Sequence, residues 1–166
     1  MGGFTFLRNI IKRKSIHLRH LLQIGILMEE RGKNFYDKLA DRAINPDVKR
    51  LCNKLAGDEI RHKQLIEDTL SHWLPFPIYP ETLERLERKM NVRGIFLNPP
   101  PLDSKEEDMA KYAIEQEKKS ADFYLSFEKT FPEIWKRMHV QNLAMEEKSH
   151  ANDLIAAYPQ FKDIIV

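Results

Sequence analysis

The stretch Glu59-Ile60-Arg61-His62 is followed, 88 residues further along the chain, by Glu147-Lys148-Ser149-His150, so the motif Glu-x-x-His occurs twice. The same shift places residues of the first half on identical residues of the second half. The matched pairs are Glu29 with Glu117, Ile26 with Ile114, Phe35 with Phe123, Tyr36 with Tyr124, Leu55 with Leu143 and Ala56 with Ala144. The chain therefore contains an internal repeat of two halves. Each half supplies one isolated glutamate and one Glu-x-x-His motif.

Helical periodicity distinguishes the two isolated glutamates from their acidic neighbours. Glu29 shares a helix face with Ile26 and other apolar residues, whereas Glu30 falls among polar ones. The same contrast separates Glu117 from Glu115. We therefore expect one glutamate of each half to point into the core while its acidic neighbour points to solvent.

The two Glu-x-x-His motifs continue apolar stripes as well. Leu55 precedes the first motif and Leu143 the second on the same helix face, whereas Asp58 and Glu146 fall on more polar faces. Four carboxylates and two imidazoles thus converge on one apolar core. Burial of a single carboxylate costs several kcal/mol, and four together also repel one another, so such a cluster requires cations or protons.

Two divalent cations would balance four carboxylates. One glutamate from each of two helices, with one Glu-x-x-His from each of two others, is the ligand set of di-iron carboxylate centres in ferritin-like four-helix bundles. The candidate metal ligands are Glu29, Glu59, His62, Glu117, Glu147 and His150. Oxygen and imidazole ligands without thiolates favour two iron ions, with manganese or a mixed pair as alternatives. A bundle that has lost its metal is the remaining interpretation. We expect Glu59 and Glu147 to bridge the ions.

Two tyrosines accompany these ligands. Tyr36 and Tyr124 each follow the isolated glutamate of their half by seven residues, which places them on the same helix face. We predict that they hydrogen-bond ligating carboxylates and act as catalytic residues. The alternative is an ordinary core tyrosine in each half.

Two glycines flank Glu29 within a segment that is otherwise typical of a helix. Gly25 and Gly32 each cost about 1 kcal/mol relative to Ala at such positions, so two in one helix require an explanation. They could leave space over the metal ions for oxygen or peroxide. Close packing of neighbouring helices would explain them equally well, and the sequence leaves both readings open.

The whole chain is predicted to be an all-α, ferritin-like four-helix bundle. The expected helices begin after Ser15 and end near residue 43, then span about 46–73, 104–130 and 131–158. Asn45-Pro46 predicts the start of the second helix, and Ser104 with Glu107 predicts a capping box at the start of the third. A long crossover joins the second and third helices, and we expect a short extra helix at 81–90 within it. That connection distinguishes ferritin-like bundles from simple up-and-down bundles.

Composition places further limits on function. The 166 residues carry a net charge of +2, and the only cysteine is Cys52, which excludes a four-cysteine iron or zinc module within them. Residues 1–16 form a basic, amphipathic segment, expected to pack on the bundle or on a partner subunit or to be partly disordered, with peripheral membrane contact as the lesser alternative. Residues 17–166 form the bundle. We expect a cytoplasmic protein, a homodimer, and no nucleic-acid partner.

Four stretches of the sequence resemble the rubrerythrin family. They are residues 28–36, 55–62, 117–124 and 143–150, within a resemblance that spans about 17–158. The resemblance implies that the six candidate ligands bind iron and that the centre reduces peroxide or dioxygen. Rubrerythrins proper carry an extra glutamate on the third helix, three residues from its other ligand, whereas this chain has Ser120 three residues after Glu117 and Ile114 three residues before it.

The resemblance predicts a di-iron oxidoreductase that receives electrons from an external donor protein, because rubrerythrins proper use a rubredoxin module that these residues lack. The alternative is a non-catalytic iron-binding or ferroxidase protein for iron handling. A sensor, or a metal-free interaction bundle that uses the basic segment, is a third hypothesis. Re-reduction of the centre by a donor would distinguish the first of these from the second.

Overall fold

The computed structural model describes residues 2–73, 85, 88, 94–131 and 133–164, and within them it contains helices and turns but no strand. The long helices are α1 (Gly2–Arg42), α2 (Pro46–Trp73), α4 (Glu106–Phe127) and α6 (Gln141–Ala157). Shorter elements are η1 (Glu128–Thr130), α5 (Glu133–Trp135), the π-helical turn η2 (Lys136–Val140) and η3 (Pro159–Phe161). The predicted all-α class is confirmed.

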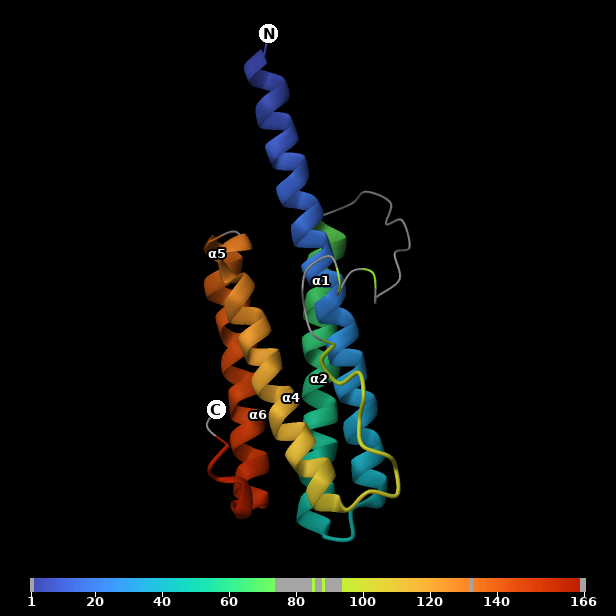
Figure 1. Cartoon of the computed structure of the whole chain (residues 1–166). Helices are drawn as coiled ribbons and strands as arrows, with labels where there is room; N and C mark the ends of the chain where they lie inside the picture. Colours follow the sequence, from blue (N-terminus) through green and yellow to red (C-terminus); the bar gives the residue numbers. More distant parts are fainter. Residues whose placement is uncertain (1, 74–84, 86–87, 89–93, 132, 165–166) are drawn as a thin grey trace.

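The four long helices form two hairpins. Helix α1 packs along α2, and α4 packs along α6, while α2 and α4 run in the same direction because a long crossover connects them (Figure 1). The α1–α2 turn follows the sequence prediction, since Asn45 Oδ1 accepts a hydrogen bond from the Asp47 amide at 2.8 Å ahead of Pro46. The ferritin-like topology with one crossover follows from this arrangement.

Helix α1 begins earlier than predicted. It starts at Gly2 rather than after Ser15, so most of the basic segment continues the first helix of the bundle, and Figure 1 shows this part extending beyond the other helices. The reason is local, because no proline or glycine interrupts the sequence from Phe4 to Ile24. The division of the chain at residue 16 stays a prediction.

The capping box predicted at the start of the third helix is wrong. Helix α4 starts at Glu106, and its N-cap residue Lys105 makes no side-chain capping bond. Ser104 instead donates its amide to the carbonyl of Pro101 at 2.9 Å, in a turn that closes the proline-rich stretch. The acids in the first turn of α4 still complement the helix dipole. The short helix expected at 81–90 lies almost entirely outside the described residues.

The predicted fourth helix, 131–158, is divided by the π-helical turn η2. Trp135 and Val140 are both buried although they are five residues apart, a spacing that an α-helix would turn to different faces. A π-helical turn brings such residues to one face. Trp135 then donates to Thr69 Oγ1 at 3.1 Å, which joins this end of the bundle to α2.

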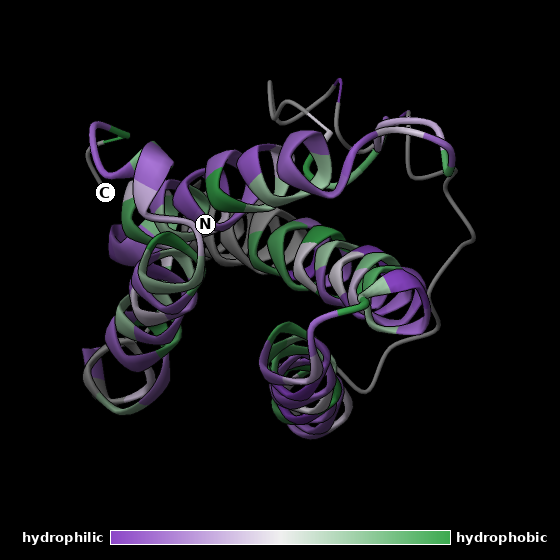
Figure 2. Ribbon diagram, turned by 90° about the horizontal axis from the view of Figure 1, so that it is seen from below, coloured by the Kyte–Doolittle hydropathy of each residue, from purple (hydrophilic) through white to green (hydrophobic). Residues whose placement is uncertain are grey.

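Apolar side chains from all four long helices form one core. Figure 2 shows apolar and polar segments alternating along each helix, as amphipathic helices require. The largest fully buried side chains are Tyr36, Leu21, Ile24, Leu39, Leu55, Ile66, Met109, Ile114, Leu143, Leu154 and His62. None of the described helices has a stretch apolar and long enough to span a bilayer.

Candidate metal centre

All six predicted ligands lie together in the middle of the bundle. Glu29 comes from α1, Glu59 and His62 from α2, Glu117 from α4, and Glu147 and His150 from α6, and none is more than 2% exposed. By contrast, the neighbouring acids Glu30 and Glu115 are exposed. Helical periodicity therefore placed these side chains on the correct faces.

The six side chains form two overlapping groups of four. One group contains Glu29, Glu59, His62 and Glu147, and the other contains Glu59, Glu117, Glu147 and His150. Within each group the ligand atoms lie within 4.8 Å of one another. Glu59 and Glu147 belong to both groups, so the arrangement suits two adjacent cations that share two carboxylates.

The ligand atoms face one another without the hydrogen bonds that buried polar groups normally make. His62 Nδ1 lies 3.3 Å from Glu29 Oε2 and 3.1 Å from Glu147 Oε1, and His150 Nδ1 lies 3.6 Å from Glu117 Oε2. The buried atoms without a hydrogen-bond partner at the centre are Glu59 Oε1, His62 Nδ1, Glu117 Oε2, Glu147 Oε1 and His150 Nδ1. Such atoms require another partner, and the donor set fits two divalent cations.

Each histidine is oriented by a carboxylate of the opposite hairpin. His62 Nε2 lies 2.9 Å from Glu146 Oε2, and His150 Nε2 lies 3.3 Å from Asp58 Oδ2. Because an ionised carboxylate only accepts hydrogen bonds, Nε2 is the donor to it, and Nδ1 faces the centre, where its lone pair would bind a cation in the neutral imidazole. Asp58 and Glu146 occupy equivalent positions in the repeat, a signal that could have identified them in the sequence.

Arg61 joins these two orienting carboxylates. Its guanidinium donates to Asp58 Oδ1 at 2.7 Å and to Glu146 Oε2 at 2.9 and 3.0 Å. Partial burial would raise the pKa of Glu146, but hydrogen bonds with His62 and Arg61 outweigh burial and lower the pKa. Glu146 therefore remains ionised, as its hydrogen bond to the imidazole requires.

The two tyrosines bind carboxylates reciprocally between α1 and α4. Tyr36 on α1 donates its hydroxyl to Glu117 on α4, and Tyr124 on α4 donates to Glu29 on α1. Burial, followed by the charges of nearby carboxylates, raises the pKa of both phenols well above the ordinary value. Both hydroxyls therefore keep their protons. Each tyrosine binds the isolated glutamate of the other half of the repeat, and a catalytic role stays a prediction.

Comparison with known proteins identifies the family. The family model described as Rubrerythrin matches residues 20–158, which include all six ligand candidates and both tyrosines. The chain belongs to the rubrerythrin family. A search of curated proteins gave no significant match. A hypothetical protein from Pyrococcus furiosus shares the fold, with a TM-score of 0.69 and 24% sequence identity over 90% of this chain and 92% of the other.

Protons neutralise part of this rubrerythrin-family centre when no cation is bound. Burial, followed by the charges of neighbouring glutamates, raises the pKa of Glu59 and Glu147 well above the usual range. Burial alone would lower the pKa of His62, but the adjacent carboxylates of Glu147 and Glu29 outweigh burial and raise the pKa to about 11. Binding of cations must therefore displace protons from these side chains.

The glycines of α1 are explained by close packing. A Cβ at Gly32 would lie 3.1 Å from Glu59 Cδ, and a Cβ at Gly25 would lie 3.2 Å from Ile66 Cδ1. The space beside both glycines is thus already filled by side chains of α2. Gly32 lets the Glu59 carboxylate approach the backbone of α1.

The crossover contributes a residue that the sequence did not indicate. Phe96 packs against Tyr36, with ring centroids 5.9 Å apart, although its φ of 52° lies in the left-handed region that aromatic residues rarely adopt. The Phe96 amide donates to Gln116 Oε1 at 3.0 Å, and Arg31 donates to the Ile95 carbonyl at 3.2 Å. These bonds hold the crossover against the tyrosine that binds Glu117.

Proposed function

We propose that this protein is a di-iron carboxylate oxidoreductase that reduces peroxide or dioxygen with electrons from an external donor protein. The observation that carries this proposal is the overlap of two four-ligand groups, which share Glu59 and Glu147. Membership of the rubrerythrin family supports it. Iron is proposed rather than zinc because the donors are carboxylate oxygens and imidazole nitrogens, with no thiolate among them.

In this proposal, two ions would be held by the two ligand groups, of which one contains His62, the other contains His150, and both contain Glu59 and Glu147. Glu29 and Glu117 would each bind one ion and are held by hydroxyls of the opposite helix. Bound iron would supply the redox chemistry, accepting electrons from the donor and passing them to the O–O bond.

The protein's own residues would keep this chemistry controlled. Burial of all six ligands leaves very little of the centre exposed to bulk water. The tyrosines retain their protons and hold the two terminal carboxylates in position while charge at the centre changes. Reduction of hydrogen peroxide to two water molecules consumes two electrons and two protons. With Cys52 as their only cysteine, these 166 residues hold no four-cysteine iron module, so we assign the electrons to a separate donor.

A second candidate is an iron-handling protein that oxidises and stores or delivers iron without repeated turnover. The observation that favours it is Ser120, a buried residue at the position where rubrerythrins proper carry an additional acid. A less anionic centre would hold ferric iron less tightly.

One experiment distinguishes the candidates. Protein loaded anaerobically with Fe²⁺ is assayed for metal content and for anomalous scattering at the iron and manganese edges, then mixed with peroxide or oxygen in the presence of a reducing donor. Repeated turnover supports the oxidoreductase. A single oxidation followed by iron release supports iron handling. Failure to bind two ions, with Glu59→Ala/Glu147→Ala protein behaving like the unmodified chain, would refute both.

A further inference from the structure

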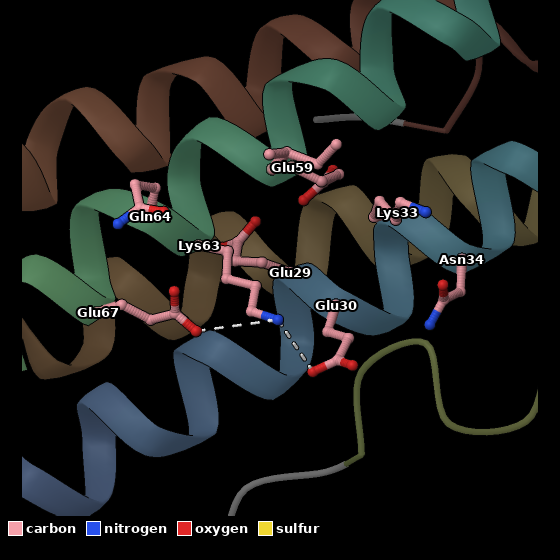
Figure 3. A pocket seen from close by; sticks show the side chains of 9 residues that line it. Glu29, Glu30, Lys33, Asn34, Glu59, Lys63, Gln64 and Glu67 are labelled. Carbon is pink, nitrogen blue, oxygen red and sulfur yellow. Dashed lines mark hydrogen bonds and ion pairs between the residues drawn. The ribbon is translucent and has the colours of Figure 1, made fainter.

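A cavity between α1 and α2 connects the buried centre with the protein surface. It has a volume of about 360 Å³, and its lining residues are Glu29, Glu30, Lys33, Asn34, Glu59, Ile60, Lys63, Gln64 and Glu67. Two of them, Glu29 and Glu59, are buried ligand candidates, whereas the others lie nearer the surface. Figure 3 shows both carboxylates at the inner end, between the two helices.

Lys63 spans the outer end of this cavity and pairs with acids of both helices. Lys63 Nζ on α2 lies 3.3 Å from Glu30 Oε2 on α1 and 3.8 Å from Glu67 Oε1, as Figure 3 shows. All three side chains are partly exposed, at 31%, 49% and 42%. Ion pairs of this kind are weak, so the lysine can leave the acids without disturbing the fold.

The two halves of the repeat differ at residues that line this cavity. Lys33 and Lys63, which line the cavity, correspond to Ala121 and Ala151 in the second half, and these alanines are 1% and 0% exposed. Short buried side chains therefore fill the equivalent positions between α4 and α6. The two halves share their ligands but differ at the residues that would give access to them.

A carboxylate that lines the cavity carries an unsatisfied ligand atom. Glu59 Oε1 is buried, has no hydrogen-bond partner, and belongs to a residue that lines the cavity. A divalent cation that enters would therefore pass from the surface acids Glu30 and Glu67 to the carboxylates of Glu29 and Glu59. The path is lined by oxygen ligands at both ends.

We propose that this cavity is the entrance through which divalent cations reach the centre, and that Lys63 gates it. The inference rests on the two-metal centre of the proposed function. With Lys63 paired to Glu30 and Glu67, the positive charge repels an approaching cation. When Lys63 turns away, the two acids attract the cation and direct it inward.

The test measures the rate of Co²⁺ uptake by metal-free protein, followed by the visible absorbance of the bound ion at low and high salt. Lys63→Ala removes the gate and is expected to increase the association rate about fivefold at low salt, with a smaller gain at high salt. Lys148→Ala is the matched control, because Lys148 is also a surface lysine directly after a ligand but lies on α6, outside the cavity. Its rate should stay within about twofold of the unmodified protein.

A second pair of variants tests the path itself. Ile60 is 54% exposed and lines the cavity, so Ile60→Trp should narrow it and slow uptake about tenfold while two ions still bind at equilibrium. Met145→Trp, at a 66% exposed position of α6, is the control and should leave the rate unchanged. If Ile60→Trp deforms the fold, Gln64→Trp replaces it.

The outcomes separate this inference from the proposed function. A Lys63→Ala rate equal to that of the unmodified protein overturns the gate, and an unchanged Ile60→Trp rate overturns the entrance, in both cases with two ions still bound. Absence of Co²⁺ binding by the unmodified protein would instead overturn the metal centre on which the inference rests.

Discussion

Glu146 Oε2 lies 2.9 Å from His62 Nε2 although 84 residues separate the two in the chain. The contact joins α6 to α2, so each hairpin determines the orientation of a histidine that belongs to the other. His150 and Asp58 form the equivalent contact at 3.3 Å. The geometry of the centre therefore depends on correct docking of the two halves, and ligand orientation can be tested without changing a ligand.

Replacing Glu146 should weaken metal binding without unfolding the protein. Its side chain is 40% exposed, so Glu146→Ala removes little buried surface but leaves His62 without its orienting carboxylate. Partners of this kind typically contribute about 10- to 100-fold to metal affinity. Competition against a chelator of known affinity measures the loss, with Glu115→Ala as a control at an exposed acid on α4. Equal affinities for the two variants would contradict the orienting role.

Metal binding should stabilise the fold. Clustered carboxylates destabilise the metal-free core, and a ligand that binds only the native state raises stability by mass action. Chelation should therefore lower the melting temperature of the loaded protein at neutral pH. Glu59→Ala or Glu147→Ala should abolish this dependence, because each removes a carboxylate that both ligand groups share. Calorimetry that gives the same melting curve with and without chelator would show that the cluster does not bind cations.

The stability of the metal-free protein should fall as pH rises from about 6.5 toward 11. The pKa of His62 rises from 6.5 to about 11 on folding, so its stabilising contribution is complete below 6.5 and is lost as pH approaches the folded value. The raised pKa of Glu59 and Glu147 acts in the same direction, since the folded state holds their protons more tightly. Bound cations displace these protons, so metal affinity should instead increase with pH.

Calorimetry of the metal-free protein across this pH range tests whether its stability falls as pH rises. Calorimetric titration with metal in buffers of different ionisation enthalpy counts the protons that the cations release. A Glu59→Gln/Glu147→Gln protein should release fewer protons. Melting temperatures that rise with pH in the metal-free protein would contradict the assigned protonation states.

Gly32 and Gly57 offer a matched comparison of two glycines within helices. Gly57→Ala meets no atom within 4 Å and should stabilise the protein by about 0.5–1 kcal/mol through helix propensity. Gly32→Ala gains the same propensity but places its Cβ 3.1 Å from Glu59 Cδ, so the carboxylate must move. We expect Gly32→Ala to weaken metal binding and Gly57→Ala to leave it unchanged, as measured by chelator competition. Unchanged affinity would mean that Glu59 moves without cost.

Periodicity predicted the candidate ligands because burial on a helix repeats along the helix itself. It did not identify Asp58 and Glu146 as orienting residues, because their partners lie on the facing helix and a single helix face gives no information about that contact. It also gave no signal for Phe96, which belongs to an irregular loop with no period. The start of α4 differs from the prediction for a related reason. Ser104 can act either as a helix N-cap or as a turn residue, and the preceding prolines favour the turn.

The last prediction concerns the choice of oxidant. By the resemblance to rubrerythrins proper, Ser120 stands where they carry an additional acid, so the proposed ligand set would carry less negative charge. A less anionic site stabilises ferric iron less, and the ferrous form should be easier to regenerate. Nothing in the donor set then favours peroxide over oxygen, and we expect both to oxidise the reduced protein at similar rates. Stopped-flow mixing of the diferrous protein with each oxidant measures them. A peroxide rate about two orders of magnitude above the oxygen rate, equivalent to roughly 2.7 kcal/mol in activation free energy, would contradict this prediction and indicate a dedicated peroxidase.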